Sequence, residues 1–304
     1  MIYIIVILIL IVTNGYVAVR KLFDYIHMRG SKALGGEEIL LPRSHSLYDA
    51  TENFRKQDHE VWEIENDRLK LVAYFYPQEK VCNKTVVLTH GFGVDHNSLN
   101  IFGQLFYKLG FNVLMPDNRA SGQSDGKYMT FGFFEKNDLN KWIKKLNKTI
   151  PDQEVLLFGA SMGAATELQA VTTELPDNVV AIIEDSSYTS ALEIIKIHAA
   201  KKVGQLANFV VPILSFYAKQ RSGFDYKEVS GLEAIKQTEL PIMFVVGGED
   251  KVVPPYMGQK LYDSYTGSKE LYENPQGIHI RSYNQNPEEY EQKINSFLKD
   301  YFKE

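Results

Sequence analysis

Five short apolar runs recur along the chain, and each of them ends in Gly, Asp or Ser. A strand that is apolar at nearly every position has both faces buried, which is typical of a parallel sheet covered by helices on both sides. This pattern therefore favours an α/β fold. The five runs are TVVLTHG (85–91), FNVLMPD (111–117), EVLLFGAS (154–161), VVAIIEDSS (179–187) and PIMFVVGGED (241–250).

Helical segments alternate with these strands. Residues 135–150 place their apolar side chains on one stripe, 96–110 end in a glycine suited to a helix C-cap, and 288–302 close the chain. Nearer the N-terminus, residues 59–65 and 69–77 flank the turn NDR and predict a hairpin. Such alternation of strands and helices predicts a doubly wound α/β sheet.

One interval, residues 189–240, breaks this alternation with about fifty residues of helical character. A crossover between parallel strands needs only about a dozen residues, so the surplus predicts an inserted helical cap at about 189–240. Within it, ANFVVPILSFYAK (207–219) is unusually apolar. This stretch either packs on the sheet or partly roofs a pocket for an acyl group.

The composition excludes several classes of protein. A chain of 304 residues, 44% of them hydrophobic, suits one large globular domain or two small ones. The net charge is -5 and no basic run stands out, which argues against a nucleic-acid partner. The single cysteine, Cys82, excludes an internal disulfide and a CxxC metal site. There is no HExxH spacing and no phosphate-binding glycine motif, so we expect neither metal nor cofactor.

The N-terminus begins with twelve apolar residues, MIYIIVILILIV, and the first charged side chain is Arg20. The 19 uncharged residues are just long enough to cross a bilayer core of ~30 Å as a helix. A cleaved signal peptide and a buried or surface helix are the alternatives. We expect an uncleaved transmembrane anchor at 1–19, a connector at 20–58 and a globular domain at 59–304 that contains the cap.

The charges that flank the apolar segment bear on its orientation. Arg20, Lys21, Arg29 and Lys32 all follow the segment, and only the α-amine precedes it. The positive-inside rule then places the globular domain on the cytoplasmic side of the membrane. We therefore expect a single-pass membrane protein whose globular domain lies in the cytoplasm.

The sequence GASMG (159–163) lies between the apolar run 154–158 and a helix-like segment that starts near residue 162. A GxSxG motif at such a strand-to-helix turn holds its serine in a strained conformation, and glycines on either side avoid side-chain clashes. The helix N-terminus also places backbone amides where an anion would form. Ser161 is therefore the candidate nucleophile, and an ordinary glycine-rich turn is the alternative.

A serine nucleophile in this context needs an acid and a histidine after it in the chain. Asp250 ends the strand 241–250, and His279 follows the last apparent strand. The only other histidine after Ser161 is His198, which falls inside the predicted cap. For the acid, Asp185 at the end of the strand 179–187 is the alternative to Asp250.

Backbone amides for an oxyanion should come from two places. One is the residue after the nucleophile, Met162, and the other is the loop THGFG (89–93), where we assign the amide of Phe92. His90, in the same loop, is then expected to brace the turn and not to act as the base.

The order of these motifs resembles that of the α/β-hydrolase superfamily. More narrowly, the chain is similar to bacterial membrane-anchored or secreted serine hydrolases related to serine aminopeptidases and monoacylglycerol lipases, over about residues 60–303. Where these relatives usually read Asp-x-Arg-Gly-x-Gly-x-Ser, this chain has Ala120 and Ser121 in place of the expected pair. The matching elements are HGFG, DNRASGQSDG (117–126), TFGFFEKNDL (130–139), GASMG, GGEDKVVPP and GIH.

The resemblance implies an eight-stranded, mostly parallel sheet with helices on both faces and a helical cap. It also implies that Ser161 is the nucleophile, His279 the general base and Asp250 the orienting acid, with Phe92 and Met162 as oxyanion donors.

The implied activity is hydrolysis of short- to medium-chain or lipid-derived carboxylic esters through an acyl-enzyme. The implied partners are a small-molecule ester or lipid substrate and a membrane, reached through the N-terminal segment. Two alternatives share the triad, an acyl-thioesterase and a serine peptidase. A third is a catalytically silent, membrane-tethered binding protein.

Overall fold

The centre of the molecule is an eight-stranded sheet with the strand order β1-β2-β4-β3-β5-β6-β7-β8. The structure is a computed structural model that describes residues 2–35 and 40–302, without the side chains of residues 2 and 4–12. The strand β2 runs antiparallel to both β1 and β4, and all the other adjacent strand pairs are parallel, so the predicted mostly parallel sheet of eight strands is confirmed. The strands are β1 (Glu60–Asn66), β2 (Leu69–Tyr76), β3 (Lys84–Thr89), β4 (Asn112–Pro116), β5 (Glu154–Ala160), β6 (Val179–Asp185), β7 (Ile242–Gly247) and β8 (Lys269–Asn274).

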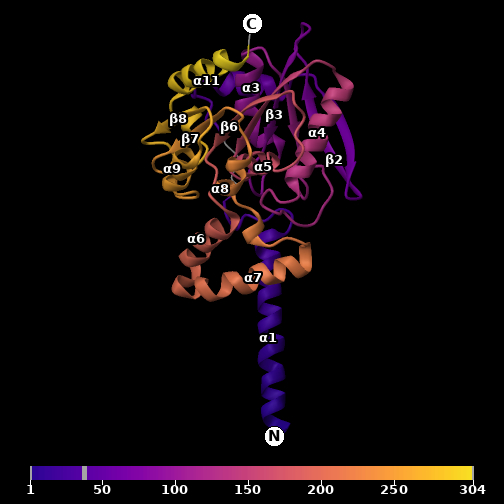
Figure 1. Cartoon of the computed structure of the whole chain (residues 1–304), viewed down its shortest axis with the longest axis vertical. Helices are drawn as coiled ribbons and strands as arrows, with labels where there is room; N and C mark the ends of the chain where they lie inside the picture. The colour runs from indigo at the N-terminus through magenta and orange to yellow at the C-terminus, as the bar shows by residue number, and fades with distance from the viewer. Residues whose placement is uncertain (1, 36–39, 303–304) are drawn as a thin grey trace.

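Helices cover both faces of this sheet, and their apolar sides form two cores (Figure 1). Phe102 and Phe297 belong to the core on one face, and Trp142 and Leu168 to the core on the other. This arrangement confirms the predicted α/β class. The helices around the sheet are α2 (Tyr48–Arg55), α3 (Asn100–Lys108), α4 (Glu135–Thr149), α5 (Met162–Ala170), α8 (Gly231–Ala234), α9 (Pro255–Ser264), α10 (Ser282–Gln285) and α11 (Pro287–Tyr301).

A helical insertion follows β6 and stands away from the sheet (Figure 1). Its two long helices are α6 (Ala191–Val203) and α7 (Ala207–Ser222). Buried residues of α7, among them Val211 and Leu214, share a third core with Phe23 of the N-terminal helix. The apolar stretch 207–219 therefore packs on helices and not on the sheet, while its outer side stays exposed, with Phe209 at 72%.

The N-terminal helix α1 (Ile2–His27) projects from the body of the molecule, and α7 crosses it (Figure 1). Its last turns are fixed in place because Phe23, Ile26 and His27 are buried in the third core and its surroundings. The helix continues past the apolar run into the charged residues Arg20 and Lys21.

The predicted membrane location is wrong by the criterion of length and hydropathy. Within residues 2–35 and 40–302, as far as they are described, no helix is both long enough and apolar enough to cross a bilayer. The single-pass anchor at 1–19 and the cytoplasmic placement that depended on it are therefore not supported. Met1, the first residue of that predicted anchor, lies outside the described residues.

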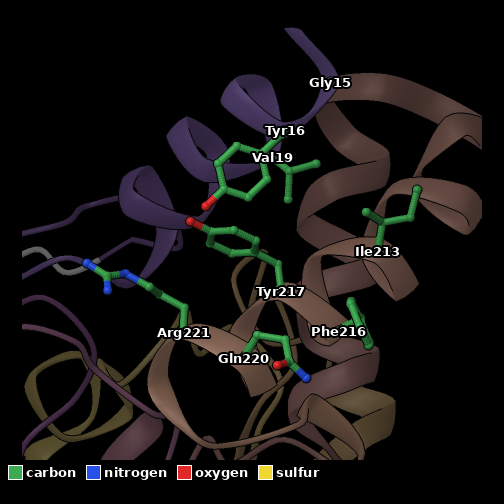
Figure 2. Close-up of a pocket in the computed structure, with 8 residues that line it drawn as sticks. All are labelled: Gly15, Tyr16, Val19, Ile213, Phe216, Tyr217, Gln220 and Arg221. Atoms are coloured by element: carbon green, nitrogen blue, oxygen red, sulfur yellow. The ribbon is translucent and has the colours of Figure 1, made fainter. Parts of the chain in front are cut away.

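A groove of about 470 Å³ lies between α1 and α7 (Figure 2). The ring of Tyr16 meets that of Tyr217 edge-on, with the ring centroids 5.7 Å apart. No residue of this groove lines the cleft around Ser161 that is described below. The groove is lined by Gly15, Tyr16, Val19, Ile213, Phe216, Tyr217, Gln220 and Arg221.

Candidate active site

Ser161 lies on a sharp turn between β5, which ends at Ala160, and α5, which begins at Met162. Its backbone has φ 57° and ψ -115°, a left-handed conformation that a residue with a side chain rarely adopts. The two flanking glycines are required by close contacts. A Cβ on Gly163 would lie 1.8 Å from the carbonyl oxygen of Thr89, and one on Gly159 would lie 2.4 Å from the nitrogen of Ala164.

The structure brings Ser161, His279 and Asp250 together from three separate loops at the carboxyl ends of the strands. The distance from His279 Nε2 to Ser161 Oγ is 2.9 Å, and that from His279 Nδ1 to Asp250 Oδ2 is 2.6 Å. The Asp250 side chain is only 2% exposed and that of His279 17%. This is the geometry in which an imidazole can take a proton from a hydroxyl while a carboxylate fixes its orientation.

Asp250 is itself held by the loop after β7. Its Oδ1 accepts hydrogen bonds from the backbone amides of Val252, at 2.7 Å, and Val253, at 2.9 Å. The carbonyl of Val252 in turn accepts a hydrogen bond from His198 on α6, at 2.9 Å. The cap histidine thus supports the acid loop and takes no part in the Ser161–His279 contact.

Asp185, the alternative acid, makes other contacts. Its carboxylate accepts hydrogen bonds from Ser186 Oγ at 2.8 Å and Tyr290 Oη at 3.1 Å, and no hydrogen bond joins it to His279. Its carbonyl oxygen accepts the backbone amide of Ser161 at 2.8 Å. Burial raises the pKa of Asp185 to about 6, against the effect of these two hydroxyl donors. The geometry therefore places Asp250, and not Asp185, against the histidine.

The loop after β3 passes directly beside the nucleophile. A Cβ on Gly91 would lie 3.4 Å from Ser161 Cβ, and Phe92 lines the same cleft as Ser161. Among the described residues, neither the amide of Phe92 nor that of Met162 has a hydrogen-bond acceptor in another loop or turn. Neither amide is therefore occupied by such a contact, and their role as oxyanion donors stays a prediction.

His90 braces this loop. Its Nε2 accepts the backbone amide of Asn118 at 2.9 Å, so the ring proton is on Nδ1, which donates to the carbonyl of Gly91 at 2.8 Å. Burial lowers the pKa of His90 and favours the neutral ring that these two bonds require. The hydrogen-bond partner of Ser161 Oγ is His279 and not His90.

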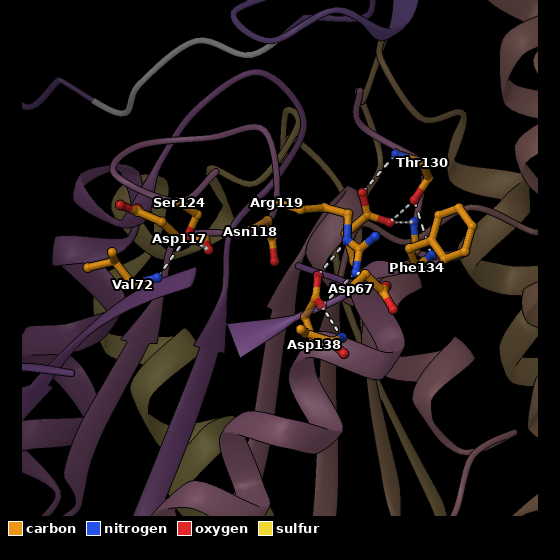
Figure 3. Close-up of polar contacts among 12 residues, drawn as sticks. Asp67, Val72, Asp117, Asn118, Arg119, Ser124, Thr130, Phe134 and Asp138 are labelled. Atoms are coloured by element: carbon orange, nitrogen blue, oxygen red, sulfur yellow. Dashed lines mark hydrogen bonds and ion pairs between the residues drawn. The ribbon is translucent and has the colours of Figure 1, made fainter. Parts of the chain in front are cut away.

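The segment after β4 is shaped by a buried ion pair (Figure 3). Arg119 donates to both carboxylate oxygens of Asp138, at 2.6 and 2.7 Å, and its guanidinium also lies over the ring of Phe134. The next residue, Ala120, has φ 60°, the conformation that the glycine of the related motif adopts at no cost. The departure from the motif therefore changes a turn that lies outside the Ser161–His279–Asp250 contacts.

One cluster of potential metal ligands is found among the described residues, formed by Asp95, His96 and Asp117. His96 Nδ1 is 2.8 Å from Asp117 Oδ1, and Asp117 Oδ2 accepts the amide of Gln123 at 2.7 Å. These groups already pair with one another and with the backbone, so the cluster fits a structural role in the loop.

A cleft of about 410 Å³ opens beside Ser161 and His279. Two of its lining residues, Leu34 and Gly35, belong to residues 20–58, for which the sequence predicts only a connector. No motif identifies them, because their place in the cleft depends on packing against Val252, whose side chain lies 3.6 Å from a Cβ built at Gly35. No residue of α7 lines the cleft, so α7 does not roof it.

Comparison with known proteins agrees with this architecture. The model of the serine aminopeptidase S33 hydrolases matches residues 82–231. The uncharacterized protein YqkD of Bacillus subtilis is 30% identical over 265 residues, which cover 86% of each chain. Monoglyceride lipase of Rattus norvegicus is 29% identical over 136 residues, 43% of each chain. The esterase Pf2001 of Pyrococcus furiosus superposes with a TM-score of 0.64 at 22% identity, covering 87% of this chain and 99% of that one.

The fold and these matches define an α/β hydrolase. Within that class, the chain belongs to the serine hydrolases of the serine aminopeptidase and monoglyceride lipase type. The resemblance and the fold class predicted from the sequence are thereby confirmed, and the family supports a hydrolase activity.

Proposed function

We propose that the protein hydrolyses carboxylic esters of small molecules through an acyl-enzyme formed on Ser161. The observation that carries the proposal is the position of His279, whose two ring nitrogens contact Ser161 Oγ at 2.9 Å and Asp250 Oδ2 at 2.6 Å. The cleft beside it is mostly apolar, which suits a short or medium acyl chain, including one derived from a lipid.

In the first half of the proposed reaction, His279 Nε2 takes the proton of Ser161 as the hydroxyl attacks the ester carbonyl. Asp250 holds the Nδ1–H tautomer and stabilises the imidazolium that forms. The amides of Phe92 and Met162 bind the oxyanion of the tetrahedral intermediate. His279 then gives its proton to the leaving alcohol, and the acyl group remains on Ser161.

In the second half, His279 takes a proton from water, which attacks the acyl-enzyme at the same carbonyl. Collapse of the second intermediate returns the proton to Ser161 and releases the carboxylic acid. Neither α6 nor α7 lines the cleft, and His198 on α6 donates to the loop that holds Asp250.

The test is the Ser161→Ala variant. We expect its kcat for a short p-nitrophenyl ester to fall at least about 10³-fold, because loss of a serine nucleophile removes the covalent route. A fluorophosphonate probe should label Ser161 in the wild type, as mapped by peptide mass, and should not label the variant. Ser44→Ala, at an exposed serine outside the cleft, is the matched control.

Retention of wild-type turnover in Ser161→Ala, or labelling at another residue, would refute the proposal. Specificity constants for acyl thioesters and aminoacyl anilides, measured beside those for esters, distinguish the esterase from the two other activities that use the same triad. A value for either class above that for esters would transfer the assignment to that class.

A further inference from the structure

Three charged side chains line the cleft that contains Ser161: Glu249, Lys251 and Arg281. Most of the other lining residues are apolar, among them Leu34, Phe92 and Val252. These side chains carry one negative and two positive formal charges, so the cleft has an excess of positive charge beside the nucleophile.

The backbone of Arg281 is fixed in place by the fold. This residue follows His279 by two residues, and Ile280 between them has φ 50°, a left-handed turn that redirects the chain. The amide of Arg281 donates to the carbonyl of Ile278 at 3.0 Å, and its own carbonyl accepts the amide of Gln285 at 3.0 Å. Arg281 is partly buried, whereas Glu249 and Lys251 are exposed.

The guanidinium of Arg281 makes no hydrogen bond or ion pair with any of the described residues. Arg119, which has a structural role, differs from Arg281 because its guanidinium donates hydrogen bonds to both Asp138 and Asp67. A guanidinium has five donors in a planar fork that matches a carboxylate or phosphate. An unpaired fork in a cleft beside a nucleophile is therefore suited to a ligand from outside.

We propose that Arg281, assisted by Lys251, binds an oxyanion that the substrate carries outside its scissile ester. The substrate class is thus an ester with a carboxylate or a phosphate on its acyl or its alcohol part. Glu249 is the one acidic residue that lines the cleft, and as an exposed group it moderates the positive charge without pairing with Arg281. This inference rests on the proposed function, since it assigns a substrate to the same site.

The test compares matched anionic and neutral esters. One pair places the charge on the acyl part, mono-p-nitrophenyl glutarate against p-nitrophenyl butyrate. The other places it on the alcohol part, 4-acetoxybenzoate against phenyl acetate. We expect Arg281→Gln to lower the ratio of kcat/KM, anionic over neutral, by about 10- to 100-fold in at least one pair. The ratio for Arg281→Lys should lie between those for the wild type and Arg281→Gln, and Glu249→Gln should raise the ratio.

The control is Arg68→Gln, which removes the same charge from the β1–β2 turn at the opposite edge of the sheet from β8. It should leave the ratio unchanged. A binding measurement supplements the kinetics: glutarate should slow fluorophosphonate labelling of Ser161 in the wild type and lose this effect in Arg281→Gln. If the ratio is unchanged in both pairs and glutarate protects both proteins equally, the inference is wrong.

This failure is distinct from failure of the proposed function. If the wild type turns over neutral esters and is labelled at Ser161 while Arg281→Gln leaves the ratio intact, only the anion site is refuted. If the wild type cleaves none of the four esters and Ser161 is not labelled, the proposed esterase is refuted and the anion site with it.

Discussion

Two aspartates at neighbouring strand ends show how contacts separate a catalytic candidate from a structural one. Asp250 faces His279 with one oxygen and receives two backbone amides on the other. Asp185 receives Ser186 and Tyr290, and its backbone carbonyl holds the amide of Ser161. Sequence position cannot distinguish the two, because both follow buried strands whose carboxyl ends meet at one edge of the sheet.

At the residue scale, we expect Asp250→Asn to reduce kcat for a p-nitrophenyl ester by about 10³- to 10⁴-fold, because the amide no longer fixes the Nδ1–H tautomer of His279. Asp185→Asn should lower kcat by less than about tenfold, since this carboxylate makes no hydrogen bond to the imidazole and the substitution alters about one hydrogen bond. Steady-state kinetics on both variants, at matched protein folding by circular dichroism, provide the comparison. A larger loss in Asp185→Asn would reverse the assignment of the acid.

At the scale of elements, the β5–α5 turn is the part of the site that sequence predicts best. Its requirements are local, because Gly159 and Gly163 must be small wherever a strand turns sharply into a helix. The strands were predictable for a similar reason, since their continuous apolar runs indicate burial on both faces. The packing of α7 was not predictable from the sequence, because α7 packs against α1, which lies nearly two hundred residues earlier in the chain.

We expect Gly163→Ala to lower kcat/KM by at least about 100-fold, because the new methyl group would overlap the carbonyl of Thr89 and displace Ser161 from its partners. The melting temperature should fall as well. Gly15→Ala is the matched control: a Cβ there meets no atom within 4 Å, and alanine favours the helix in which it lies. Equal activity in the two variants would show that the turn tolerates a side chain.

For the molecule as a whole, His27 joins three parts of the chain. Its Nδ1 donates to the carbonyl of Met129 at 2.9 Å, so its Nε2 accepts the hydroxyl of Tyr226 at 2.6 Å, and its ring stacks on Phe23. The sequence gives no sign of this role, because a histidine in a charged helix end is typical of a solvated residue. Its importance follows from the aromatic residues that the fold assembles around it.

Burial lowers the pKa of His27 to about 4, against an ordinary value of 6.5. The unfolded chain therefore binds more protons than the folded one between these values, and the free energy of unfolding should decrease as the pH falls from 6.5 towards 4. His27 alone should lower the free energy of unfolding by about 2 kcal/mol when the pH falls from 7 to 5.

Urea unfolding at pH 7 and pH 5 tests this expectation. His27→Gln should be less stable than the wild type at pH 7, because it loses aromatic packing, but its stability should fall less between the two pH values. The difference between the two proteins isolates His27 from the other buried groups that titrate in this range. A drop of equal size in both proteins would contradict the lowered pKa.

Leu34 and Gly35 lie outside the span that the family model recognises, yet they form part of the wall of the cleft. Ser161, Asp250 and His279 come from loops of the globular domain, whereas this part of the cleft wall is encoded in a separate, short N-terminal stretch of the gene. Exchange of this short N-terminal stretch between relatives would give evolution, and chimera design in the laboratory, a way to reshape one wall of the cleft while the loops that hold Ser161, Asp250 and His279 are inherited unchanged.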